Sequence, residues 1–156
     1  MGGTLVCAVT EGEESADALA LGAELSRRLR LRLVLAHAVA GIDGDGGGES
    51  VTMKANRQGA ERRLARLADE HGVDNLAERR IGVGEPAASL AQIAAEEAAD
   101  VIVVGARARG WRKRLESRLA GDLETATPVP VLIAPPRSRG SRTTHPWTEG
   151  SGNVAS

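Results

Sequence analysis

Aromatic residues are almost missing from this chain of 156 residues, which has no Phe, no Tyr and only two Trp. Its core must therefore be built from Ala, Val, Leu and Ile, side chains that suit helices packed closely on a parallel sheet. Cysteine is nearly missing too: Cys7 is the only one, so no intramolecular disulfide can form. Cys7 lies within an apolar run, and we expect it to be a small core residue rather than a nucleophile, because burial raises the pKa of a thiol.

Long apolar runs and a strong charge imbalance are also missing. No stretch approaches the about 20 apolar residues of a membrane span, and the first residues lack the basic and apolar regions of a signal peptide. Together with the single cysteine, these features lead us to expect a cytoplasmic protein without a membrane partner. The net charge of −1 argues against non-specific binding of nucleic acid.

The apolar patterns that are present alternate between strand and helix. Short runs rich in β-branched residues predict strands over 4–9, 31–39, 76–82, 101–104 and 129–134. Helical spacing predicts helices over 16–30 and 51–71, a third that begins at Pro86 and a fourth before the last strand. In the first helix we expect one buried face of Ala18, Leu21, Leu25 and Leu29.

This order predicts an α/β fold with a single domain over residues 1–135. Each crossover is long enough for a right-handed parallel connection, so we expect a doubly wound, Rossmann-like sheet of five parallel strands with helices on both faces. Residues 136–156 are dominated by Arg, Ser, Gly, Thr and Pro, a composition that predicts a disordered tail.

A basic loop follows the strand that ends at Gly105. Ligands of such folds collect at the carboxyl ends of the strands, so Gly105 is expected at the centre of any site. Six basic side chains follow it, and they could hold a polyphosphate or simply form a solvated face: Arg107, Arg109, Arg112, Lys113, Arg114 and Arg118.

No catalytic or metal-binding group is predicted. His37 is expected on the same rim of the sheet as Thr10 and Gly105, and a hydrogen-bonded structural role is favoured because no partner for catalysis is identified. The glycine-rich segment 41–50 fails the spacing of a calcium loop, and it follows the second strand rather than the first, where a dinucleotide fingerprint would lie. A flexible loop is therefore the favoured interpretation.

Several segments resemble the universal stress protein family. Leu5 to Val9 with the following Glu13-Glu-Ser15 resembles the opening strand and turn of the family. Gly84-Glu-Pro86 and the strand that ends at Gly105 resemble its second half, and Pro130-Val-Leu-Ile133 resembles its last strand. The resemblance covers roughly residues 4 to 135.

The resemblance implies a possible ATP site with a degenerate motif. ATP-binding members carry G-x-x-G, nine residues and then G-S/T. Gly105 fills the first place, Ala108 stands at the second, and the third falls on Ser117 or Arg118. Thr10 stands where those members usually have Asp. The candidate cofactor contacts are Thr10, Val39, Gly105, Arg107, Ala108, Ser117 and Arg118.

Three classes of function follow for this chain. The first is a non-enzymatic stress-response protein that binds ATP weakly or not at all and acts through partners; the second is an ATP-dependent switch of the same family. The third is an ATP-using enzyme of a related fold, but the segment 10–15 lacks the S-G-G-x-D-S turn of an adenylating pyrophosphatase. We therefore expect that this protein is not an enzyme.

The resemblance also implies a homodimer formed through the last strand. We expect that strand at a sheet edge, where unpaired backbone groups invite pairing with a second copy. The candidate contact residues are Val129, Val131, Leu132 and Ile133.

Overall fold

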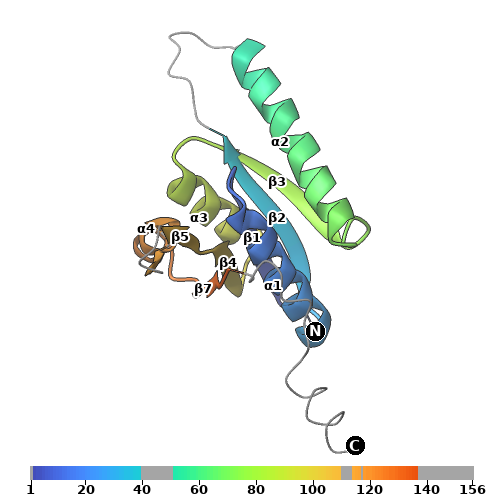
Figure 1. Cartoon of the computed structure of the whole chain (residues 1–156), viewed down its shortest axis with the longest axis vertical. Helices are drawn as coiled ribbons and strands as arrows, with labels where there is room; N and C mark the ends of the chain where they lie inside the picture. Colours follow the sequence, from blue (N-terminus) through green and yellow to red (C-terminus); the bar gives the residue numbers. More distant parts are fainter. Residues whose placement is uncertain (1, 40–50, 110–113, 117, 137–156) are drawn as a thin grey trace, which may run out of the picture.

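The computed structural model describes residues 2–39, 51–109, 114–116 and 118–136. Strands and helices alternate along the chain as predicted, except after Gly105, where two further short strands come before the last helix (Figure 1). Their order is β1 (Thr4–Val9), α1 (Glu14–Leu29), β2 (Arg32–Val39), α2 (Val51–Glu70), β3 (Ala77–Val83), α3 (Pro86–Glu96), β4 (Val101–Gly105), β5 (Arg107–Arg109), β6 (Arg114–Glu116), α4 (Arg118–Ala126) and β7 (Val131–Ala134).

The predicted five-stranded parallel sheet is confirmed, with the strand order β3-β2-β1-β4-β7. Alternate side chains of the central strands pack into two separate hydrophobic cores, one on each face of the sheet. Leu5, Cys7 and Val9 of β1 pack with α1 and α2 on one face. Val6 and Ala8 pack with α3 and α4 on the other face. Because β1 is buried along its whole length, its sequence is a continuous apolar run rather than an alternating one.

The first helix buries a different stripe from the one predicted. Ala18 is buried as expected, but the other buried positions are Ser15, Leu19, Gly22 and Ala23, and Leu29 is 61% exposed. Small residues face the sheet because they allow the helix backbone to approach β1 closely: a Cβ added at Gly22 would lie 3.3 Å from Cδ2 of Leu5. Leu21 and Leu25 pack at the margin of the same core.

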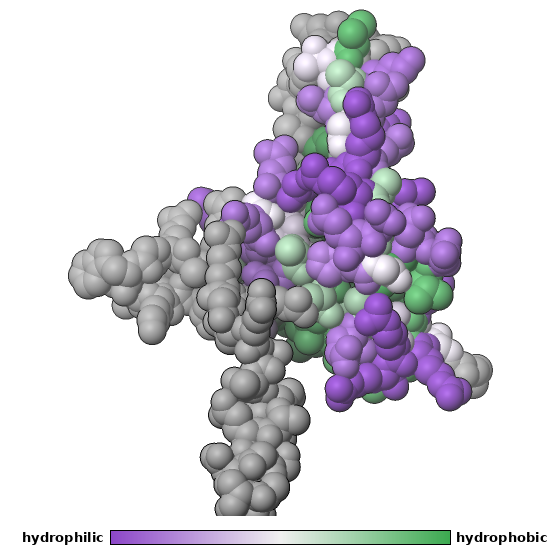
Figure 2. Space-filling view, turned by 45° about the vertical axis from the view of Figure 1, so that its right-hand side comes forward, coloured by the Kyte–Doolittle hydropathy of each residue, from purple (hydrophilic) through white to green (hydrophobic). Residues whose placement is uncertain are grey.

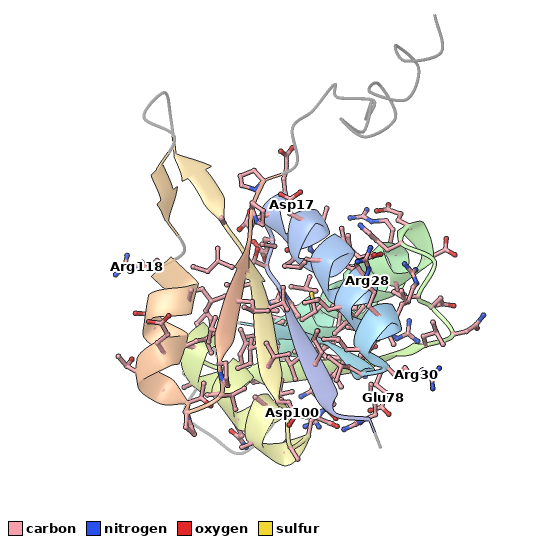
Figure 3. All side chains as sticks on the ribbon, turned by 90° about the horizontal axis from the view of Figure 1, so that it is seen from below. Asp17, Arg28, Arg30, Glu78, Asp100 and Arg118 are labelled. Carbon is pink, nitrogen blue, oxygen red and sulfur yellow. The ribbon has the colours of Figure 1, made fainter. Side chains whose placement is uncertain are left out.

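The segment after Gly105 is not the loop that the sequence predicts. β5 and β6 pair antiparallel as a two-stranded ribbon, with Ala108 opposite Leu115. Figure 3 shows this ribbon projecting beyond the edge of the sheet at which β4 ends. Arginine-rich strands give no apolar alternation, so the sequence carries little strand signal here.

The last strand begins later than residue 129. Val129 belongs to the preceding turn, where its N–H donates to the Thr127 hydroxyl. β7 starts at Val131 and lies at the edge of the sheet, beside β4, as predicted. The tail predicted from 136 onward lies, apart from Pro136, outside the described residues.

Candidate functional site

A cavity of about 550 Å³ lies at the carboxyl edge of the sheet. The first half of α2 extends past this edge, and its buried positions begin only at Ala60 (Figure 1). Figure 2 shows part of the molecule standing clear of the main body at this end, with mostly hydrophilic side chains on the visible side. The lining residues are Val9, Thr10, Glu11, His37, Ala38, Val39, Ala55, Asn56, Gly59, Ala60, Arg63, Gly84, Pro86, Leu90 and Leu119.

Thr10 sits in a turn whose polar groups are hydrogen-bonded to one another. Its N–H donates to Ser15 Oγ at 2.7 Å, and its hydroxyl donates to Glu14 Oε1 at 2.8 Å. The Gly12 N–H in turn donates to the Thr10 hydroxyl at 3.3 Å. Because Thr10 Oγ1 has already donated its single proton, it can offer a ligand only its acceptor capacity.

Arg63 of α2 closes this turn from the opposite side. Its Nε donates to the Thr10 carbonyl at 3.0 Å, and its Nη2 donates to the Gly12 carbonyl at 3.3 Å. The guanidinium has five N–H donors, so other donors remain for an anion in the cavity. Arg63 was not among the predicted site residues. The signal that could have identified it is its position: three residues after Ala60 and four before Leu67, it lies on the buried face of α2.

His37 lies beside Thr10 on the same rim, as predicted. The residue is 6% exposed, and its Nδ1 lies 2.5 Å from the Val9 carbonyl oxygen. The register of β1 and β2 places Val9 and His37 opposite each other at the ends of both strands. The hydrogen-bonded rim histidine favoured from the sequence is therefore present.

The wall opposite β2 is built from small residues of α2. Ala55, Gly59 and Ala60 line the cavity at helical spacing, and no heavy atom lies within 4 Å of a Cβ added at Gly59. Val39 lines the cavity as well, while its carbonyl accepts the Gly84 N–H at 2.9 Å. The small residues on this wall therefore leave room in the cavity beside the end of β2.

Gly105 packs against the start of α1 and is not among the residues that line this cavity. A Cβ on Gly105 would overlap the Glu14 carbonyl and lie 2.7 Å from its Cβ. Because Gly105 has no side chain, the start of α1 can lie against the end of β4. The role of Gly105 in phosphate binding stays a prediction.

The other predicted phosphate contacts are spread along the ribbon and the next helix. Arg107 and Ala108 belong to β5, whose backbone takes part in the antiparallel ladder with β6. Arg118 begins α4, is exposed, and points away from the body of the molecule (Figure 3). Ser117, Arg112 and Lys113 lie outside the described residues. Because a ladder engages backbone N–H groups, this ribbon leaves fewer of them free for phosphate than an open glycine loop would.

Neither a reactive thiol nor a cluster of metal ligands is found in the described part of the chain. Burial raises the pKa of the Cys7 thiol to about 12, so it is protonated at neutral pH, as predicted for a core residue. Across the described ranges, no three His, Cys, Asp or Glu side chains gather as metal ligands. None of the helices in those ranges combines the length and apolar character that crossing a bilayer demands.

Comparisons with known proteins agree with one another. The model of the universal stress protein family matches residues 1–135. A universal stress protein solved in complex with cAMP superposes with a TM-score of 0.63 at 22% identity, over 84% of this chain and 95% of that one. A family member from Burkholderia pseudomallei superposes with a TM-score of 0.64 at 22% identity, over 85% and 96%.

The protein from Archaeoglobus fulgidus, solved in complex with dAMP, has a TM-score of 0.58 at 20% identity, over 84% of this chain and 96% of that one. A search of curated proteins returned no match. At these identities the structural likeness shows the fold, and the family match rests on the sequence model.

Proposed function

Because this chain belongs to the universal stress protein family, we propose that it is a non-enzymatic regulatory protein of the stress response that binds an adenine nucleotide weakly. The observation that carries the proposal is the cavity of about 550 Å³, lined by Thr10 and Val39 at the carboxyl ends of β1 and β2. Two proteins of the same fold were solved as complexes with cAMP and dAMP, which supports a nucleotide as the ligand class.

Weak binding follows from how the site is built. The Thr10 hydroxyl already donates to Glu14, so it cannot also donate to a ribose oxygen. The ribbon places backbone N–H groups of β5 and β6 in a ladder instead of aiming them at a phosphate. Arg63 remains as a charged donor on the cavity wall, which favours an anionic ligand.

A role without catalysis is supported by the state of the candidate nucleophiles near the site. The Ser15 hydroxyl donates to the Thr10 carbonyl at 2.9 Å, and the Cys7 thiol is fully buried. In the described part of the chain, the hydrogen-bond partners of Ser15 Oγ are the N–H, the hydroxyl and the carbonyl of Thr10, none of which is a general base. We further propose that the protein acts in the cytoplasm, where a lone thiol stays reduced, and that it dimerises through the edge of β7.

Titration calorimetry with ATP tests the ligand. We expect a dissociation constant on the order of 0.1 mM or weaker. A micromolar or tighter value would instead favour an ATP-dependent switch. Incubation of the protein with ATP, followed by chromatography of the nucleotides, tests the absence of catalysis: turnover above the buffer blank that persists in independent preparations would contradict it.

A further inference from the structure

A second hollow lies between α2 and β3, and none of its lining residues also lines the cavity at the carboxyl edge of the sheet. Its volume is about 860 Å³. The helix contributes a stripe of residues between Arg57 and Ala65, and the strand contributes Arg79, Arg80 and Ile81. Figure 1 shows α2 running beside β3 at the margin of the molecule. We call this hollow the α2–β3 groove.

One side of the β3 backbone has no partner strand in the described part of the chain, because β3 ends the sheet. The register with β2, together with the bond from the Gly84 N–H to the Val39 carbonyl, makes the even-numbered residues of β3 face β2. The backbone N–H and C=O groups of Arg79 and Ile81 therefore point outward. Since both residues also line the groove, the free edge and the groove form one continuous surface.

The groove carries a surplus of positive charge, although the whole chain has a net charge of −1. Four of its eight lining residues are arginine and one is glutamate. Arg80 is paired with the acidic end of α3, and Arg79 Nη1 lies 4.0 Å from Asp74 Oδ1. Arg62 is exposed; within the described ranges it donates to the Gln58 carbonyl at 3.4 Å and forms no ion pair. This charge favours an acidic partner.

We propose that the α2–β3 groove binds an acidic segment of a partner protein, in an extended conformation, as an additional strand on the edge of β3. The added strand would exchange backbone hydrogen bonds with Arg79 and Ile81. Ile81 packs at the margin of the core beneath α1 and α2, so the side chain of Arg79, two residues earlier, lies on the same face of the sheet. Acidic side chains on that face would meet both Arg79 and Arg62. The inference requires no nucleotide in the cavity.

Two other occupants match this surface less well. A nucleic acid supplies phosphate oxygens that accept hydrogen bonds, but it has no regular row of donors for the outward carbonyl groups of β3. A second copy of this chain would bring one arginine-bearing edge against another. Self-pairing at both β3 and β7 would also produce an open-ended array of molecules instead of a closed dimer. An acidic peptide avoids both problems.

Fluorescence anisotropy of a labelled, capped peptide of alternating Glu and Thr, titrated with the full chain, tests the proposal. We expect a dissociation constant on the order of 0.1 mM at low ionic strength, which weakens as salt is added. A peptide with Lys in place of Glu should not bind measurably. The acidic peptide N-methylated at every residue keeps its charge but cannot donate to β3, and should bind at least about tenfold more weakly.

Two charge-reversal variants of α2 form a matched pair. Arg62→Glu changes a residue that lines the groove, whereas Arg66→Glu makes the same change at an exposed position that does not line it. We expect Arg62→Glu to weaken binding of the acidic peptide about fivefold and Arg66→Glu to weaken it less than about twofold. Equal losses in the two variants would assign the binding to the general charge of the helix and overturn the proposal.

Amide hydrogen exchange of the wild type, followed by NMR, reports pairing at the edge directly. The amides of Arg79 and Ile81 should become protected when the acidic peptide is added, whereas that of Arg80, which faces β2, should be protected in the free protein as well. Binding without new protection, or equal binding of the N-methylated peptide, would overturn the added strand.

The same measurements separate the other occupants. Protection of Arg79 and Ile81 in the protein alone would show that a second copy or another part of this chain already covers the edge, and would overturn the proposal. So would a single-stranded oligonucleotide that binds more tightly than the acidic peptide and loses affinity in Arg62→Glu. None of these outcomes bears on nucleotide binding in the cavity, because the two sites share no lining residue.

Discussion

Gly105 is a residue whose size the fold constrains directly. It ends β4, and the backbone of Glu14 at the start of α1 occupies the space that a side chain would need. The nearest atoms belong to the backbone rather than to a flexible side chain, so they cannot move aside without shifting the helix.

We therefore expect Gly105→Ala to destabilise the protein by about 3 kcal/mol, in the range of severe overpacking. Gly121→Ala is the matched control: it lies in α4 with no heavy atom within 4 Å of an added Cβ, and should stabilise by about 0.5–1 kcal/mol. Urea unfolding followed by circular dichroism measures both. Similar midpoints for Gly105→Ala and the wild type would show that α1 can shift at no cost.

Cys7 is a second residue whose properties the fold determines, in this case the protonation of its thiol. Because burial raises the pKa of its thiol from 9.0 to about 12, we expect slow alkylation by iodoacetamide in the native state and fast alkylation in urea. The unfolded chain releases the thiol proton above pH 9, so stability should fall as the pH rises beyond that value. Alkylation at equal rates in buffer and in urea would place Cys7 at the surface.

At the scale of elements, ion pairs hold the end of α3 against the edge of the sheet. Glu97, which caps α3, accepts from Arg80 Nη1 of β3 at 2.5 Å and lies 2.8 Å from Arg32 Nη1 of β2. Arg80 also pairs with Glu96, and Arg32 pairs with Glu78 at 2.7 Å. These shared guanidinium groups connect one helix end to two strands that are far apart in sequence.

The pH dependence of this cluster has a definite sign. Hydrogen bonds from Arg80 and then Arg32 lower the pKa of Glu97 below its ordinary value of 4.5, and Arg80 lowers that of Glu96. A carboxylate whose pKa is lower in the folded than in the unfolded state stabilises the fold above about pH 4.5. This stabilisation is lost as the pH falls through the pKa of the folded state. We expect Glu97→Gln to lower the unfolding midpoint at pH 7 and to match the wild type at pH 2–3.

Urea unfolding at a series of pH values measures this difference. Glu24→Gln is the control, because its pair with Arg28 within α1 is largely exposed, and it should change the midpoint little at any pH. A Glu97→Gln deficit that persisted unchanged at pH 2 would assign the effect to packing or to the neutral hydrogen bonds instead of to charge.

At the scale of the whole molecule, the free edge of β7 determines how two copies could join. Ile102 N–H donates to the Pro130 carbonyl and Ala106 N–H donates to the Ala134 carbonyl, so the backbone groups of alternate residues face β4. Those of Val131 and Ile133 therefore point outward. Leu132 and Ile133 also expose 43% and 42% of their surface, which provides apolar area for a partner.

We expect the wild type to sediment as a dimer at tens of micromolar and Ile133→Pro to sediment as a monomer, because proline removes an outward donor and spares the ladder with β4. Ile133→Val keeps the N–H and most of the side chain and should remain dimeric. Leu132→Pro would remove a donor that faces β4, so it should destabilise the fold itself. A monomeric wild type would refute this dimer.

The sequence by itself determined the α/β class, the five parallel strands and the edge position of the last strand. These depend on local patterns, since apolar runs such as 101–104 and helix-start residues such as Pro86 signal elements within a few residues. It also placed Thr10 and His37 on one rim, because parallel strands end at a common edge, and it named Val39 as a candidate contact; all three line the cavity.

Only the tertiary structure decided what those residues face. Arg63 joins the site because its side chain reaches from α2 to the carbonyls of Thr10 and Gly12. Gly105 lies against the backbone of Glu14 because α1 packs on the end of β4. The stripe that α1 buries, the ribbon after β4 and the backbone partner of His37 likewise depend on neighbours distant in sequence. Contacts of this kind arise from the packing of whole elements, which no local pattern of residues encodes.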